Sequence, residues 1–109
     1  MRIISGCFKG KKLLQPNDFK TRPLKDLTKE SIFNIINHTK KFNINLSSSI
    51  VLDVFSGVGS FGIECISRGA KNVVFIENYR NVLTVLKKNL TNLKSISNYQ
   101  IIENDIYDE

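Results

Sequence analysis

The chain has 109 residues and a mass of 12.4 kDa, with 41% hydrophobic and 24% charged residues. This length suits one modest globular domain and excludes a multidomain enzyme. The net charge is +6, but seven Phe residues favour a packed core and exclude a disordered basic tail. No apolar run approaches the ~18 to 20 residues of a membrane helix. The chain also starts too basic for a signal peptide, so we expect a soluble, cytoplasmic protein that does not contact a membrane.

The positive charge is concentrated in the first half of the sequence. Residues 1–45 hold ten Lys or Arg and three acidic residues, whereas residues 46–109 hold six Lys or Arg and seven acidic residues. Such asymmetry indicates either a polyanion-binding arm attached to a neutral chemical domain or a lysine-rich, solubilising surface. Cys7 and Cys65 lack metal-ligand spacing, so neither a metal site nor a disulfide is expected.

The first half predicts a small basic unit followed by a helix. Residues 2–4 and 7–14 are short β-prone pieces that predict a hairpin, and residues 15–23 contain both prolines and predict a loop. Residues 25–37 predict a helix, since apolar residues crowd one side of it. Those apolar residues are Leu24, Leu27, Ile32, Phe33, Ile35 and Ile36. A polar linker over residues 39–49 follows. We therefore divide the chain into a basic hairpin and loop (1–23), a helix and linker (24–45) and a third unit (46–109).

The third unit alternates strands and helices. Residues 50–55 predict a strand buried on both faces of a parallel sheet, and residues 72–76 and 99–102 predict two more strands. Residues 60–68 predict a helix, and the apolar spacing from Tyr79 to Leu93 predicts the clearest helix in the chain. The order strand, helix, strand, helix, strand is half of a doubly wound, Rossmann-like α/β sheet, whose ligands bind beyond the carboxyl ends of the strands.

A glycine motif lies at that edge. Gly57, Gly59 and Gly62 form G-x-G-x-x-G, and Glu77 follows twenty residues after the first glycine, as in a dinucleotide site. Asp53 stands four residues before the motif, where a carboxylate disfavours a pyrophosphate and favours a cation. S-adenosylmethionine (SAM), with its sulfonium, ammonium and ribose, fits this set better than a nicotinamide dinucleotide, which stays an alternative. Ser56 and Ser60 are expected to be helix-start hydroxyls, and His38 to be solvated.

These residues belong to longer blocks that resemble one family. Residues 51–64, with 67–70 and 75–77, resemble the first two motifs of the RsmD-type bacterial 16S ribosomal RNA guanine-N2 methyltransferases. Residues 2–6, 9–13 and 21–23, with Lys29-Glu30 and Phe33-Asn34, are similar to the amino-terminal blocks of that family. The resemblance implies a class I SAM-dependent methyltransferase fold. It also implies SAM as cofactor, and 16S rRNA or the assembling small ribosomal subunit as partner.

The resemblance also implies roles for single residues. Asp53, Phe55, Gly57 and Gly59 would surround the methionine end of the cofactor, Glu77 would bind its ribose, and Asn104 and Asp105 would bind the adenine edge. The residues implied to hold RNA phosphates are Arg2, Lys9, Lys11, Lys12 and Arg22. The guanine would be flipped out of its helix for direct methyl transfer.

One family motif is missing. Family members grip the target amine with an Asp/Asn-Pro-Pro-Tyr/Phe motif after a fourth strand, but no proline follows Pro23 here. The chain thus carries no catalytic residue of that motif, and we expect an amino-terminal fragment, truncated before the fourth strand, that a C-terminal chain could complete. The alternatives are a non-catalytic module that binds RNA or SAM and, less favoured, a fragment of an NAD-binding oxidoreductase.

Overall fold

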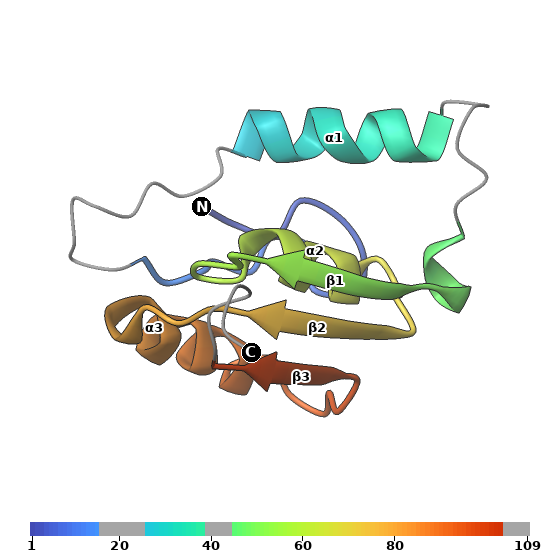
Figure 1. Cartoon of the computed structure of the whole chain (residues 1–109). Helices are drawn as coiled ribbons and strands as arrows, with labels where there is room; N and C mark the ends of the chain where they lie inside the picture. The colour runs from blue at the N-terminus through green and yellow to red at the C-terminus, as the bar shows by residue number, and fades with distance from the viewer. Residues whose placement is uncertain (16–25, 39–44, 104–109) are drawn as a thin grey trace.

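A computed structural model describes residues 1–15, 26–38 and 45–103 (Figure 1). Its elements follow the order α1 (Asp26–His38), a short 3-10 helix η1 (Leu46–Ser48), β1 (Ile50–Val54), α2 (Ser60–Ser67), β2 (Asn72–Ile76), α3 (Arg80–Thr91) and β3 (Tyr99–Ile102). The predicted alternation of strands and helices is confirmed. No helix among the described residues is long and apolar enough to cross a membrane.

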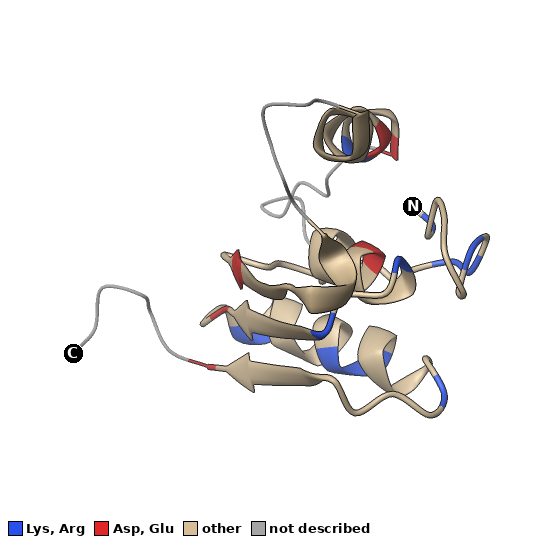
Figure 2. Ribbon diagram, turned by 90° about the vertical axis from the view of Figure 1, so that its right-hand side faces the viewer, with Lys and Arg blue, Asp and Glu red and all other residues tan. Residues whose placement is uncertain are grey.

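The three strands form one parallel sheet in the order β1-β2-β3. Asp53 lies beside Phe75, which in turn lies beside Ile101, so the carboxyl ends of the strands are level. Helices α2 and α3 cover one face of the sheet, α1 lies beyond the β1 edge of the sheet, and the amino terminus lies on the side of the helices (Figures 1 and 2). This is the parallel α/β arrangement that the sequence predicts.

The sheet has one covered face and one open face among the described residues. Val73 and Phe75 point toward the helices and are fully buried. On the other face Leu52 is 58% exposed and Ile102 is 41% exposed. The prediction that the first strand is buried on both faces is therefore wrong, because, among the residues that the structure describes, α2 packs on one face of β1 and the other face stays exposed.

The core lies between the sheet and two of the helices. From α2, Ile63 and Ile66 are buried, and from α3, Leu86 and Leu90 are buried at the four-residue spacing that places them on one face of a helix. Gly62 makes the contact between α2 and β2 close: a Cβ there would lie 2.3 Å from the ring of Phe75. This packing holds the start of α2 next to the ends of β1 and β2.

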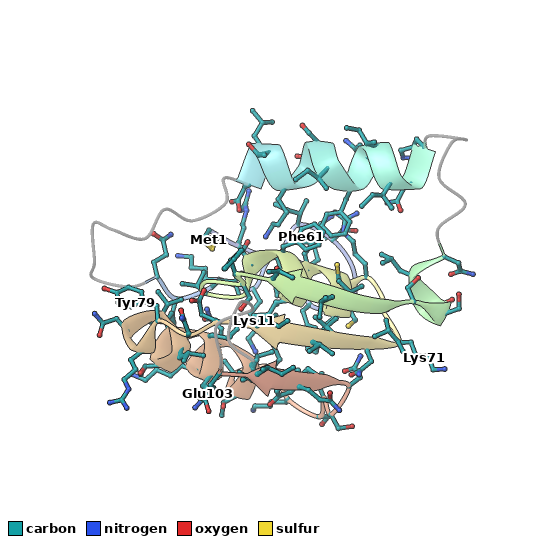
Figure 3. The ribbon with its side chains drawn as sticks, viewed as in Figure 1. Met1, Lys11, Phe61, Lys71, Tyr79 and Glu103 are labelled. Carbon is teal, nitrogen blue, oxygen red and sulfur yellow. The ribbon has the colours of Figure 1, made fainter. Side chains whose placement is uncertain are left out.

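The inward face of α1 differs from the prediction. Phe33 is fully buried and stacks on Phe61 of α2, with ring centroids 5.1 Å apart (Figure 3). Leu27 and Ile35, predicted to face inward, are 76% and 54% exposed. The residue buried one helical turn before Phe33 is instead Lys29. Lys29 can be buried at the centre of this contact because its ammonium pairs with the carboxylate of Glu64 on α2.

The amino-terminal arm (residues 1–14) folds back on itself. The amide of Ile3 donates to the carbonyl of Lys11 (2.9 Å), that of Gly10 to Ile3 (2.8 Å) and that of Leu13 to Met1 (3.1 Å). The predicted hairpin is thus confirmed as a pairing of two segments, although only Arg2 and Lys12 form a β-bridge and neither segment is a regular strand.

The arm lies along α2. Its tip contacts the end of the helix, where the amide of Cys7 donates to the carbonyl of Ser67 (2.8 Å). Gly6 passes so close that a Cβ there would lie 1.9 Å from that same carbonyl oxygen. The two ends of the arm therefore return to the other end of α2, where the glycine motif lies.

Candidate functional site

The glycine loop (residues 55–59) connects β1 to α2 at the carboxyl edge of the sheet. The amide of Ser56 donates to the carbonyl of Ile76 (3.1 Å), and the amide of Gly59 donates back to Ser56 (3.0 Å). Gly57 has φ +59°, and a Cβ there would meet no atom within 4 Å. The loop therefore turns tightly and leaves open space above Gly57, where a ligand can approach the backbone.

The other two glycines of the motif serve packing. A Cβ on Gly59 would lie 2.4 Å from Cδ1 of Leu86 on α3, and one on Gly62 would meet Phe75 and Asp53. Gly59, which the family resemblance places at the cofactor, is buried, and its missing side chain makes room for α3. Of the three glycines, only Gly57 borders open space.

Asp53 is the carboxylate beneath the loop. Its Oδ2 accepts from the amide of Gly62 at 3.0 Å. Burial raises the pKa of Asp53 to about 6, the Gly62 amide opposes that shift, and the nearby charge of Glu77 adds to it. A cationic group bound here would reverse the shift, because it would favour the ionised carboxylate.

Glu77, directly after β2, holds the loop from the other side. Its Oε1 accepts from the amide of Gly57 (2.9 Å), and its Oε2 accepts from the amides of Asn78 (3.0 Å) and Tyr79 (3.1 Å). Both oxygens are therefore oriented by backbone donors. A carboxylate held this way is positioned to accept from hydroxyl groups of a ligand above Gly57.

Two further residues indicate a ligand at the loop. The hydroxyl of Ser56 is buried and has no hydrogen-bond partner among the described residues. Phe55 adopts φ +58°, a left-handed conformation that costs a non-glycine residue roughly 1 kcal/mol or more, and is 62% exposed. The unpartnered hydroxyl, the strained backbone at Phe55 and its exposed ring lie beside two acids, and together they fit a polar ligand at the loop.

Behind the site lies a buried ion pair that the sequence pattern does not reveal. Lys29 of α1 and Glu64 of α2 lie 3.2 Å apart with both side chains fully buried. Arg68 donates from Nε to Glu64 at 2.8 Å and stacks over the ring of Phe33, 4.2 Å from its centroid. Burial alone would raise the pKa of Glu64, but the amide of Ile4, Arg68, the amide of Ser5 and Lys29 hold it below its usual range.

The same network corrects the role predicted for Ser60. Its hydroxyl accepts from Lys29 Nζ at 3.1 Å and makes no capping hydrogen bond at the start of α2. The sequence holds one signal for this network, the acid at position 64 inside an apolar helix, but nothing in it identifies the partner. His38, at the end of α1, is exposed as predicted.

The cationic residues predicted to hold RNA lie on or near the arm. Arg2, Lys9 and Lys12 are exposed, and Lys11 is half-buried with its ammonium on the carbonyl of Asn92. Within the described ranges none of these four forms an ion pair. Figure 2 shows this basic arm on the far side of the helices from the sheet. Arg22, and the proposed adenine-binding pair Asn104 and Asp105, lie outside the described residues.

The arm continues into a second basic surface. A groove of about 490 Å³ lies where the end of the arm meets α3, and its lining is Leu14, Thr84, Lys87, Lys88, Thr91 and Asn92. Lys87 and Lys88 are exposed on α3 and share this groove with Leu14 of the arm. Since Lys11 reaches Asn92, the basic surface is continuous from the arm to α3.

These features define the class of protein. A solved structure of a proposed methyltransferase from Escherichia coli superposes with a TM-score of 0.78 at 33% identity, covering 96% of this chain and 53% of that one. A proposed SAM-dependent methyltransferase from Methanococcus maripaludis shares the fold at a TM-score of 0.55 and 13% identity, with 82% of this chain and 47% of that one covered. The chain has the Rossmann-like fold of the SAM-dependent methyltransferases.

The family follows from the sequence comparison. The family model described as Conserved hypothetical protein 95 matches residues 1–109, and the chain belongs to this family. The ribosomal RNA small subunit methyltransferase D of Haemophilus influenzae is 41% identical over 97 residues, which are 89% of this chain and 47% of the relative. Its namesake in Escherichia coli K12 is 36% identical over 95 residues, 87% of this chain and 45% of the relative. The chain spans about half the length of these relatives.

Proposed function

We propose that the chain is the cofactor-binding and RNA-anchoring part of a SAM-dependent methyltransferase that modifies the N2 amine of a guanine in 16S rRNA. The observation that carries this proposal is the pair of carboxylates at the glycine loop, Asp53 beneath it and Glu77 beside it. The relatives named as ribosomal RNA small subunit methyltransferases support the choice of substrate.

The residues at the loop suit SAM, which supplies an electrophilic methyl group on a sulfonium. Asp53 would attract the positive charges of its methionine end, and Glu77 would accept from the ribose hydroxyls. Ser56 offers a hydroxyl that lacks a partner among the described residues, and Phe55 offers an aromatic ring. Asn104 and Asp105 would complete the adenine edge, as the family resemblance implies.

The arm supplies the second half of the proposal. Arg2, Lys9, Lys11 and Lys12, with Arg22, would contact phosphates, which positions an RNA without reading its sequence. The target guanine would have to leave its helix to bring its amine to the loop. Alignment of that amine with the methyl group would then supply most of the rate. We place this activity in the cytoplasm, on 16S rRNA or the assembling small subunit.

Binding of the target guanine amine needs a motif that the given sequence does not contain. No Asp/Asn-Pro-Pro-Tyr/Phe motif occurs in the chain, and we propose that further chain, covalently continuous or separate, provides it. The DNA downstream of the codon for Glu109 and the intact mass of the expressed protein distinguish the two. A labelled-methyl assay on small ribosomal subunits, with and without a supplied C-terminal half, then tests the activity.

The cofactor is tested separately by calorimetry. We expect SAM to bind the chain and NAD not to bind it, and Asp53→Asn to weaken SAM binding. The matched control is Glu103→Gln, which removes an acid of the exposed Lys87–Glu103 pair near the same sheet edge. Binding of NAD alone would refute the methyltransferase assignment.

The second candidate function is a module that binds RNA and SAM without catalysis, because the chain lacks the amine-gripping motif. This function is indicated if both ligands bind and no arrangement of chains transfers a methyl group.

A further inference from the structure

Asn89 of α3 connects the basic arm directly to the glycine loop. Its side-chain Oδ1 accepts from the amide of Leu14 at 2.7 Å. Its Nδ2 donates to the carbonyl of Leu14 at 3.2 Å and to the carbonyl of Val58 at 3.0 Å. The side chain is 1% exposed. One buried amide therefore joins the last residue of the arm to the middle of the loop.

Lys29 makes a second connection at the other end of the arm. Its ammonium donates to the carbonyl of Arg2 at 2.9 Å and to the hydroxyl of Ser60 at 3.1 Å, and it pairs with Glu64 at 3.2 Å. An ammonium has three donors, and all three are used. Arg2 is one of the proposed phosphate contacts, and Ser60 begins the helix that follows the loop.

Glu64 fixes the arm to the same helix. Its two oxygens accept from the amides of Ile4 (2.8 Å) and Ser5 (3.0 Å). The first strand-like segment of the arm thus cannot shift along α2 without leaving a buried carboxylate partly unpaired, which is costly. The arm and the loop are consequently two ends of one hydrogen-bonded unit.

We propose that Asn89 and Lys29 are positioning residues that couple the two sites, so that RNA seated on the arm stabilises the bonded geometry of the glycine loop and cofactor in the loop stabilises that of the arm. The proposal rests on the function proposed above. Both sites share these buried hydrogen bonds, so a ligand that stabilises the bonded geometry at one end also favours it at the other, which produces positive cooperativity between the two ligands. Such coupling is reciprocal: each ligand must tighten the other by the same factor.

The test measures S-adenosylhomocysteine affinity by calorimetry with the full-length protein, alone and saturated with a transcript of small-subunit rRNA, at constant salt. We expect about fivefold tighter binding or more in the presence of the transcript. Asn89→Leu and Ser60→Ala should each lower this ratio, because each removes one of the two connections, and the double variant should bring it close to one. Ser60→Ala is the milder variant, since Lys29 keeps Arg2 and Glu64, and it serves if Asn89→Leu fails to fold.

The ratio separates coupling from a general structural defect, because a change in intrinsic cofactor affinity cancels within each variant. The matched control is Ser31→Ala, whose hydroxyl bonds only within α1, to the carbonyl of Leu27 at 3.0 Å, and which should keep the wild-type ratio. A ratio of one in the unaltered protein, with both ligands bound, overturns the coupling and leaves the proposed function standing. Failure of either ligand to bind overturns the proposed function and the coupling with it.

Discussion

Asn in place of Asp53 should stabilise the chain at neutral pH while it weakens the cofactor site. The carboxylate is half-buried near the charge of Glu77, and desolvation raises its pKa from 3.8 to about 6 on folding. Asn keeps an oxygen that can accept from the amide of Gly62, but it cannot ionise. The variant therefore removes a charge that the fold disfavours and keeps the hydrogen bond that the fold uses.

The magnitude follows from the pKa shift. The folded chain binds the Asp53 proton more tightly than the unfolded chain, so the stability linked to that proton is fully present below pH 3.8 and is lost as pH rises to about 6. At 1.36 kcal/mol for each pKa unit, the loss reaches about 3 kcal/mol at pH 7.5 and about 1.5 kcal/mol at pH 5. Asp53→Asn should gain these amounts of unfolding free energy relative to the unaltered chain.

Urea unfolding followed by circular dichroism at pH 5 and pH 7.5 measures both values. The reasoning is refuted if the variant is not more stable at pH 7.5, or if its advantage does not grow between the two pH values. The same pKa predicts cofactor affinity: if only ionised Asp53 binds the cation, SAM should bind the unaltered chain about tenfold more tightly at pH 7 than at pH 5. Asp53→Asn should remove that dependence.

Three further outcomes test the remaining parts of the structure. Glu64→Gln should lower the free energy of unfolding in urea by about 3 to 5 kcal/mol, because it leaves Lys29 buried without its counter-ion. Glu103→Gln on the surface should lower it by less than about 1 kcal/mol, and equal losses of stability would contradict the burial of the Lys29–Glu64 pair. A thiol reagent should modify one cysteine, Cys7, in the folded chain and two in urea, since Cys65 is buried and its pKa is raised to about 12; rapid reaction of both in the native state would exclude this packing of α2. Lys9→Ala should lower the salt dependence of RNA binding by about one unit of slope, and an unchanged slope would remove Lys9 from the RNA surface.

Local patterns predicted the strands well and the contacts of α1 poorly. Both β2 and β3 have the predicted bounds, because each is a short β-prone run with polar residues on either side, which mark where the strand begins and ends. A helix over residues 25–37 was also predicted and is found as α1 (Asp26–His38), but its buried face is built on Lys29, which pairs with a residue 35 positions later on α2. Apolar periodicity ranks a lysine as a surface residue, so it cannot find a face whose centre is an ion pair.

The glycine motif shows the same limit at the site itself. In the sequence, Gly57, Gly59 and Gly62 are equivalent members of one pattern, and that pattern fits a dinucleotide as well as SAM. In the structure, Gly59 and Gly62 make room for Leu86 and Phe75, and only Gly57 faces open space. Gly59 and Gly62 are thus needed for close packing of the helices and the sheet, a requirement that is independent of the ligand. In the proposed function the choice of ligand rests instead on Asp53, whose carboxylate would favour a cationic cofactor over a pyrophosphate.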